Sequence, residues 1–394
     1  MDTDALRERR QRIDAIDADV VRLLNERARI AQEIGRAKTA DARLPFAPER
    51  EREVLERVRQ LGHEGPLHDA HLAAIYREII SACRNLERPL QVAYLGPAAS
   101  FTHEAALERF GEATRLVAMD SIPDVFAETQ RGRADFGVVP VENSSEGSVH
   151  LTLDSFIESD LQVCSEIVLS ISHHLLSRSP IEQVQKLYSN PVALAQCRQW
   201  VARNLPGREI IEVTSTTRAA MMAAEDPTGA AISPLLAATQ YKLDVIASDI
   251  QDLASNYTRF YVIASGVASE PTGRDKTAII FSIRDRVGAL RDAADVFARR
   301  SLNMHSIQSR PSRRKAWEYL FFIEFEGHER DALVREALDE LKNQCIFLKA
   351  LGSWPIDEGL GARAQARGSV VRDQGPETNQ GLVSEPRPVA SDPR

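Results

Sequence analysis

The chain has 394 residues and carries 49 lysines and arginines against 57 aspartates and glutamates. This length predicts two or three domains, and the composition, 43% hydrophobic and 27% charged, is that of a globular protein. No run reaches the roughly 18 apolar residues of a membrane span, and the first residues lack the pattern of a secretory signal. The net charge of −8 argues against a nucleic-acid partner, and four scattered cysteines without a CxxC pair favour a cytoplasmic location over a disulfide framework.

Residues 1–89 predict an all-α domain. One long helix is expected over 4–38, where apolar residues recur along a single stripe, and shorter helices are expected over 48–61 and 69–87. A domain dominated by one long helix has a thin core, so we expect it to dimerise.

The hydrophobic period changes after this helical region. Residues 90–268 alternate short apolar runs, such as 163–176, with helical stretches, which predicts an α/β domain with a largely parallel sheet. Residues 275–355 follow the order βαββαβ of an α+β ferredoxin-like domain. Residues 356–394 are rich in Gly, Pro, Arg, Gln and Ser and predict a disordered tail.

Two cations interrupt the apolar stripe of the first helix. Arg27 and Lys38 lie about 20° apart around the helix and about 16 Å apart along its axis. A buried cation is costly unless an anion meets it, so the side chains either snorkel from a coiled-coil-like stripe or line a pocket for a small dianion. Glu87, on the apolar side of the third helix, and Arg50-Glu51 on the second favour the pocket.

Residues 1–89 resemble the helical chorismate mutase domain, and the segments that carry the resemblance are 10–17, 24–27, 33–38 and 48–51. The resemblance implies that chorismate, a dicarboxylate, is rearranged to prephenate without a nucleophile, in a compact conformer that the protein holds. Carried over residue by residue, it assigns Arg10, Arg27 and Arg50 to the substrate carboxylates, Lys38 to the ether oxygen and Glu51 to the hydroxyl, with Cys83 and Glu87 at the contact positions of the third helix.

The family forms an intertwined dimer in which one subunit lends an arginine to the other. Arg10 fits this role because it lies about 25 Å from Arg27 along the helix axis, too far to share a site within one helix. Some relatives carry aspartate where Ala47 stands and glutamine where Glu87 stands. Because a carboxyl group donates a hydrogen bond only when protonated, we expect mutase activity to fall as Glu87 ionises.

Residues 90–268 resemble prephenate dehydratase, whose fold is two α/β lobes of periplasmic-binding-protein-like form, through segments 94–105, 139–144, 188–191, 195–197, 214–216 and 256–260. The resemblance makes Thr258 essential for dehydration, positioned by Arg259 and Phe260, with Glu142 as a second candidate proton handler. The remaining candidate contacts to prephenate are Ser100, Asn143, Ser144, Ser215 and Thr216, which stand at expected helix starts, where each could instead be a cap. Ala99 and Asn190 depart from the family pattern, which usually has glycine and histidine there.

Residues 275–355 resemble the amino-acid-binding ACT domain. The resemblance implies that phenylalanine binds as an effector at a dimer interface, and the matching residues are Gly288, Ala289, Leu290, Gln308, Ser309, Arg310 and Pro311. Relatives usually have glutamate where Gln308 stands. A ferredoxin-like dimerisation module without a ligand is the alternative.

Together these segments predict a multidomain, homodimeric or larger enzyme that carries both activities in L-phenylalanine biosynthesis, from chorismate through prephenate to phenylpyruvate. No cofactor is expected because no glycine-rich phosphate loop is present, and His103, His173 and His174 match no zinc motif. The alternative class is a non-catalytic, amino-acid-responsive binding protein. The polar set Arg27, Lys38, Glu87 and Thr258 favours the enzyme, since a mere sensor does not need these residues.

Overall fold

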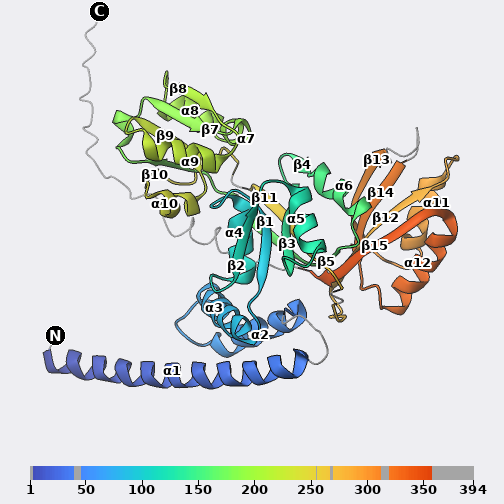
Figure 1. Ribbon diagram of the computed structural model, residues 1–394, viewed down its shortest axis with the longest axis horizontal. Coiled ribbons are helices and arrows are strands. Elements are labelled where there is room, and N and C mark those ends of the chain that lie inside the picture. Colours follow the sequence, from blue (N-terminus) through green and yellow to red (C-terminus); the bar gives the residue numbers. More distant parts are fainter. Residues whose placement is uncertain (1–2, 40–45, 254, 267–268, 312–318, 357–394) are drawn as a thin grey trace, which may run out of the picture. The chain divides into compact units, whose positions relative to one another are not determined.

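The computed structural model describes residues 3–39, 46–253, 255–266, 269–311 and 319–356 (Figure 1). The tail expected to be disordered therefore lies, apart from residue 356, outside the described residues. Within the described part of the chain, no helix has both the length and the apolar character needed to cross a membrane.

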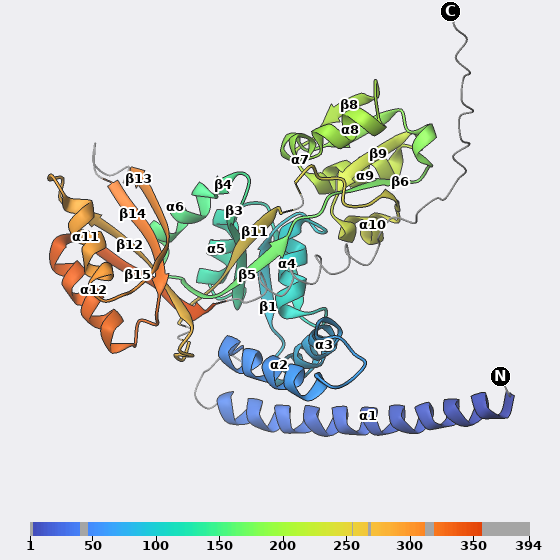
Figure 2. The same ribbon diagram turned by 180° about the vertical axis from the view of Figure 1, so that it is seen from behind.

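The N-terminal region folds as the expected helices α1 (Thr3–Thr39), α2 (Pro48–Gly62) and α3 (Asp69–Glu87). Helix α1 approaches α3 closely at Gly35, where an added Cβ would lie only 2.8 Å from the Cβ of Glu87. Figure 2 shows that the N-terminal half of α1 runs beyond α2 and α3, and there Ile13 and Ile16 remain 56% and 54% exposed. The apolar stripe that predicted this helix is thus only partly covered within one chain.

The first lobe of the α/β domain is built on a sheet of order β2-β1-β3-β11-β5, with the short β4 paired to β3. The strands are β1 (Gln91–Leu95), β2 (Arg115–Met119), β3 (Phe136–Asn143), β4 (Gly147–Ser148), β5 (Gln162–Ser170) and β11 (Tyr257–Ala264), with helices α4 (Phe101–Phe110), α5 (Ile122–Gln130) and α6 (His150–Glu158). β1 is parallel to β2 and β3, whereas β11 is antiparallel to β3 and to β5.

The second lobe has a sheet of order β10-β6-β9-β7-β8. Its elements are β6 (His174–Ser177), η1 (Ile181–Gln183), β7 (Lys186–Ser189), α7 (Pro191–Gln196), α8 (Arg198–Asn204), β8 (Glu209–Glu212), α9 (Thr216–Glu225), β9 (Gly229–Ser233), α10 (Leu235–Tyr241) and β10 (Asp244–Ala247). β7 is parallel to β8 and β9, while β6 is antiparallel to β9 and β10.

The two-lobed α/β architecture is confirmed, but two expectations are wrong. Each sheet is mixed rather than largely parallel, because β11 and β6 run against their neighbours. The apolar run 163–176 is not one strand: β5 belongs to the first sheet and β6 to the second. Nearly every residue of this run is buried, including those where the chain crosses from the first lobe to the second. The hydrophobic pattern therefore gives no sign that the strand ends there.

The C-terminal region has the expected βαββαβ order, with β12 (Asp275–Ile283), α11 (Ala289–Ala298), β13 (Met304–Pro311), β14 (Tyr319–Glu326), α12 (Ala332–Gln344) and β15 (Cys345–Pro355). The sheet order is β13-β14-β12-β15. One side of this sheet forms a core with its own helices, in which Phe297 and Phe325 are buried. The other side shares a core with the first lobe, where Trp354 packs against Tyr261 with ring centroids 5.3 Å apart.

Candidate active sites

A cavity of about 650 Å³ lies between helices α1, α2 and α3. Its lining includes the predicted residues Arg27, Arg50, Glu51, Cys83 and Glu87. Cys83 is buried, and Arg27 and Glu87 are half-buried. The side chain of Arg50 is 59% exposed and pairs with Glu53 at 2.7 Å, so this arginine stands at the mouth of the cavity.

Two predicted substrate contacts, Arg10 and Lys38, are not among the described residues that line this cavity. Arg10 is exposed on α1, about 25 Å before Arg27 along the axis. Lys38 belongs to α1, but its side chain lies outside the described residues. Ala47 lines the cavity and occupies the N-cap of α2, where it makes no side-chain capping bond.

Arg84 is a cavity residue that sequence reasoning missed. It is 3% exposed, bonds to a carboxylate oxygen of Glu51, and donates from Nη2 to the carbonyl of Phe110 at 2.6 Å. Burial lowers the pKa of Arg84, whereas the neighbouring Glu51 acts in the opposite direction. Helix spacing was an available signal, since Ile80, Arg84 and Glu87 recur at intervals of four and three residues.

The second partner of Glu51 comes from the first lobe. Arg109, near the end of α4, donates to Glu51 Oε2 at 3.0 Å, and its guanidinium lies 4.8 Å from the ring centroid of Phe46. Sequence reasoning had no signal for this contact because it joins residues 58 positions apart across a domain boundary. Glu51 is therefore held between two guanidiniums, so its charge is paired and the lining arginines Arg27 and Arg50 are left for other anions.

In the α/β domain, Thr258 stands opposite Asn143 in the register of β11 and β3. Asn143 Nδ2 donates to Thr258 Oγ1 at 2.8 Å. The orientation of this amide is fixed because Asn143 Oδ1 accepts the backbone N–H groups of Ser145 and Glu146. The expectation that Asn143 and Ser144 open a helix is wrong, since Asn143 is the last residue of β3 and Ser144 begins the turn to β4.

A polar cluster surrounds this pair where the chain passes between the lobes. Asn256 Oδ1 accepts from Asn143 Nδ2 at 3.1 Å, and Asn256 Nδ2 donates to Gln196 Oε1 at 3.1 Å. The same Gln196 oxygen lies 2.9 Å from His173 Nε2, and burial lowers the pKa of His173. The hydroxyl of Ser144 accepts the N–H of Tyr257 at 3.0 Å. Gln196 and Asn256 stood inside matching sequence segments, although neither was singled out as a site residue.

The other predicted prephenate contacts lie at the starts of helices α4 and α9, outside this polar cluster. Ser100 and Ser215 are N-caps of α4 and α9, where their hydroxyls accept backbone N–H groups, and Thr216 begins α9. Ala99 has a left-handed φ of 62°, a conformation that glycine adopts more readily than alanine. Asn190 caps α7 by accepting the N–H of Val192 at 3.0 Å.

Along β11, opposite a bulge in β3, side chains alternate between the two faces of the sheet. The register shifts between Arg259 and Phe260, so that Arg259 pairs with Glu142 while Thr258 pairs with Asn143. Phe260 is buried in the core of the first lobe. Arg259 donates to Glu142 at 2.9 Å, so both of these predicted site residues face the other side of the sheet.

The predicted effector residues lie on two elements. Gly288 is the left-handed N-cap of α11, which Ala289 and Leu290 begin. On the edge strand β13, Ser309 and Pro311 are exposed, whereas Arg310 pairs with Asp154 of α6 at 2.8 Å. Gln308 lines a small cavity of about 20 Å³ together with Arg259 and Glu324.

Family models match three consecutive parts of the chain. They are chorismate mutase type II over residues 9–88, prephenate dehydratase over 92–267 and the ACT domain over 277–343. The matches follow the same order as the helical region, the two lobes and the C-terminal sheet.

Similar proteins cover nearly the whole chain. The bifunctional chorismate mutase/prephenate dehydratase of Aquifex aeolicus is 50% identical over 355 residues, which span 89% of this chain and 98% of that protein. The protein of the same description from Pseudomonas aeruginosa is 42% identical and covers 90% of this chain and 98% of its own length. A prephenate dehydratase structure from Arthrobacter aurescens, in complex with L-Phe, is 30% identical with a TM-score of 0.63, covering 72% of this chain and 99% of that one.

Proposed function

Because the chain belongs to the family of bifunctional chorismate mutase/prephenate dehydratases, it is an enzyme of both reactions, and we propose that two separate sites perform them. The helical cavity rearranges chorismate to prephenate. The polar cluster around Thr258 converts prephenate to phenylpyruvate, water and CO₂. The observation that carries the mutase assignment is a cavity whose wall gathers Arg27, Arg50 and Arg84 around an apolar interior.

The mutase reaction needs only orientation and charge. One C–O bond breaks and one C–C bond forms within the same molecule, so no nucleophile and no net proton transfer are required. Arg27 and Arg50 bind the substrate carboxylates, while Lys38 and a protonated Glu87 act on the ether oxygen. Glu51, fixed by Arg84 and Arg109, accepts the substrate hydroxyl.

A second copy of the chain completes this site. Arg10 cannot reach the cavity of its own chain, and the apolar residues Ile13, Ile16 and Val20 beside it are about half exposed. We therefore infer a homodimer in which the N-terminal part of α1 covers the partner's cavity and supplies Arg10. The same pairing buries the apolar stripe.

In the dehydratase reaction, Thr258 delivers a proton to the leaving hydroxyl of prephenate. The bond from that hydroxyl to the ring breaks as the ring carboxylate leaves as CO₂, and the electron pair of the broken C–C bond completes the aromatic ring. Because Asn143 donates to Thr258 Oγ1, the threonine keeps its own proton for the substrate, and solvent replaces that proton after the reaction. Ser100, Ser144, Ser215 and Thr216 are the proposed contacts to the substrate carboxylates.

Phenylalanine regulates the enzyme through the ACT domain, and we propose that it binds between the start of α11 and the exposed side of β13, at an interface with a second copy. The L-Phe complex of the Arthrobacter aurescens dehydratase supports this assignment. We further propose a cytoplasmic location, which suits the free thiols of Cys83, Cys164, Cys197 and Cys345.

Reciprocal variants of the full chain test both sites in one assay. With chorismate as substrate, Thr258→Ala should accumulate prephenate and form phenylpyruvate at least about 100-fold more slowly than the wild type. Lys38→Gln should lose prephenate formation but still convert added prephenate to phenylpyruvate.

Thr258→Ser is the matched control because it retains the hydroxyl, and it should keep most of the dehydratase rate. Undiminished dehydration by Thr258→Ala would remove Thr258 from the mechanism. An unchanged mutase rate in Lys38→Gln would leave the helical region with an assembly role only.

A further inference from the structure

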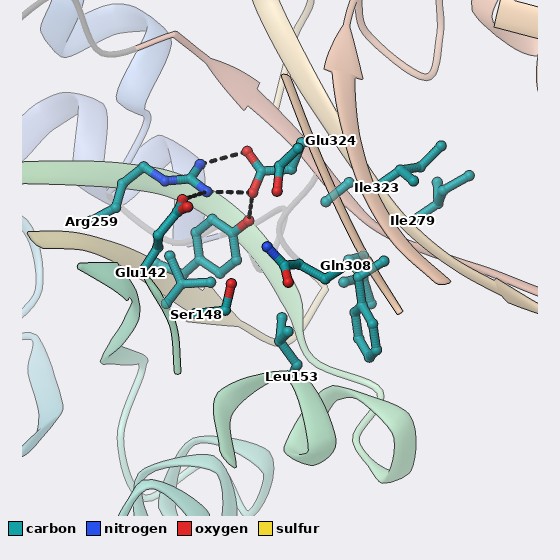
Figure 3. Close-up of a pocket in the computed structure, with 14 residues that line it drawn as sticks. Glu142, Ser148, Leu153, Arg259, Ile279, Gln308, Ile323 and Glu324 are labelled. Atoms are coloured by element: carbon teal, nitrogen blue, oxygen red, sulfur yellow. Dashed lines mark hydrogen bonds and ion pairs between the residues drawn. The ribbon is translucent and has the colours of Figure 1, made fainter. Parts of the chain in front are cut away.

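The guanidinium of Arg259 forms ion pairs with three carboxylates, two of which are drawn in Figure 3. It donates to Glu324 at 2.5 and 2.7 Å, to Glu142 at 2.9 Å and to Glu166 at 3.4 Å. Glu142 and Glu166 belong to the same lobe as Arg259, whereas Glu324 lies on β14 of the ACT domain. The ion pair between Arg259 and Glu324 therefore joins the ACT domain directly to β11, the strand that carries Thr258.

Arg259 does not face the substrate. Side chains alternate along a strand, so Thr258 and Phe260 point to one face of β11 while Arg259 and Tyr261 point to the other. The packing agrees, because Phe260 is buried in the core of the first lobe and Tyr261 in the core shared with the ACT domain. Arg259 therefore influences the reaction through the backbone of β11 rather than by contact with prephenate.

Glu324 is buried where the ACT domain contacts the first lobe. It is 6% exposed, it grips both terminal nitrogens of Arg259, and it accepts a hydrogen bond from the hydroxyl of Tyr261. Burial by itself raises the pKa of Glu324, but the bonds from Arg259 and Tyr261 lower it overall, so the carboxylate stays charged. A bidentate pair of this kind fixes the plane of the guanidinium and hence the strand that carries it.

We propose that Glu324 of the ACT domain is a positioning residue for the dehydratase reaction, because through Arg259 it fixes the strand segment that presents Thr258. This inference rests on the proposed role of Thr258. The same bond transmits the effect of phenylalanine binding to the dehydratase site. The edge strand β13, beside the proposed effector site, is hydrogen-bonded to β14, which carries Glu324. A shift of β14 moves Glu324 and turns Arg259, although no part of the effector touches prephenate.

Gln308 fits the same arrangement. Its side chain projects into the cavity beside Ser148 and the Arg259–Glu324 pair (Figure 3). Around Arg259 the cluster gathers three carboxylates, Glu142, Glu166 and Glu324, which pair with Arg259 and Lys276. A glutamate at position 308 would add a further negative charge to this excess, whereas glutamine adds none.

The test compares Glu324→Gln with Glu326→Gln in the full chain. Glu326 lies on the same strand, is about half exposed, and pairs with His305, so its neutralisation serves as the matched control. We expect Glu324→Gln to lower the dehydratase kcat about 10- to 100-fold with little change in the KM for prephenate. The mutase rate of the same preparation measures the folded fraction and should stay at the wild-type value, and Glu326→Gln should behave like the wild type.

The response to phenylalanine separates positioning from a merely structural defect. Glu324→Gln should still bind phenylalanine in calorimetry, but its residual dehydratase rate should no longer respond to the effector. Where Glu324→Gln does not fold, Tyr261→Phe replaces it, because this variant removes only the hydroxyl donor to Glu324 and should lower kcat about threefold. A folded Glu324→Gln, or in its place Tyr261→Phe, with wild-type kcat and wild-type inhibition overturns the proposal. A wild-type enzyme without dehydratase activity would instead count against the proposed function.

Discussion

The proposed mutase cavity and β11, the strand that carries the proposed catalytic residue Thr258, each contain a charged side chain that a neighbouring domain also binds. In the cavity, the carboxylate of Glu51 is shared by Arg84 of the helical region and Arg109 of the first lobe. On β11, the guanidinium of Arg259 is shared by carboxylates that include Glu324 of the ACT domain. The two clusters have the same construction and opposite signs.

The sign of each cluster tells what its charges meet. The cluster at Glu51 sets two guanidiniums against one carboxylate, and it adjoins the cavity proposed for chorismate, whose lining carries three arginines and three glutamates. The cluster on β11 joins three carboxylates to Arg259 and Lys276 where the ACT domain meets the first lobe, and this negative surplus would repel a dianion. On the opposite face of β11, the groups around Thr258 are the uncharged amides of Asn143, Asn256 and Gln196. Under the proposed function, formal charges therefore serve the mutase step and directed dipoles serve the dehydratase step.

The largest expected effect comes from putting a charge among those amides. In Asn143→Asp the carboxylate would accept a hydrogen bond from Thr258 instead of donating one, so the threonine proton would point away from the substrate. We expect the dehydratase kcat to fall about 100-fold while the mutase rate is unchanged.

The control for this variant is Asn204→Asp, which makes the same chemical change at an exposed position near the end of α8. Both proteins are compared by steady-state assays with prephenate and with chorismate. A dehydratase rate within twofold of the wild type in Asn143→Asp would show that the direction of this hydrogen bond is irrelevant.

The next prediction concerns a residue of the dehydratase lobe that is expected to affect the mutase reaction. Arg109→Ala removes one of the two guanidiniums that hold Glu51, although Arg109 belongs to the dehydratase lobe. Breaking a fully buried pair costs about 3–5 kcal/mol; here Arg109 is 19% exposed and Arg84 remains, so we expect a smaller loss, roughly tenfold in mutase kcat/KM.

Arg133→Ala is the control, since Arg133 is an exposed arginine of the same lobe that pairs with Glu128. The assay follows loss of chorismate, and prephenate dehydration in the same samples reports on the integrity of the lobe. Equal mutase kinetics in Arg109→Ala and Arg133→Ala would mean that Glu51 needs only Arg84.

These contacts also show how far the sequence could be read. Arg27 and Glu87 were found because they interrupt apolar stripes of helices, and the helices and the βαββαβ order follow from local periodicity. Arg84 lies on the same face of α3 as Glu87, so the same helical spacing predicts that it lines the cavity. Arg109 and Glu324 could not be found, since each acts on a residue 58 or more positions away in another domain.

The catalytic strand itself shows a second limit. Asn143 was expected to open a helix because small polar residues after a strand usually do, and only the pairing of β3 with β11 reveals its contact with Thr258. The bulge that turns Glu142 toward Arg259 depends on the same long-range pairing.

The smallest effect concerns Glu87, the cavity carboxylate that acts in its neutral form in the proposed mutase mechanism. Glu87 can donate a hydrogen bond to the ether oxygen only in its protonated form, and the mutase rate of the wild type should therefore fall several-fold as rising pH ionises this group. Glu87→Gln keeps the shape and donates at any pH, so its profile should be flat over the same range. The pH dependence of kcat/KM for chorismate distinguishes the two, and Glu26→Gln, at an exposed position on the rim of the same cavity, serves as the control for a general change in charge. Identical profiles for the wild type and Glu87→Gln would remove Glu87 from the chemistry and leave the ether oxygen to Lys38 alone.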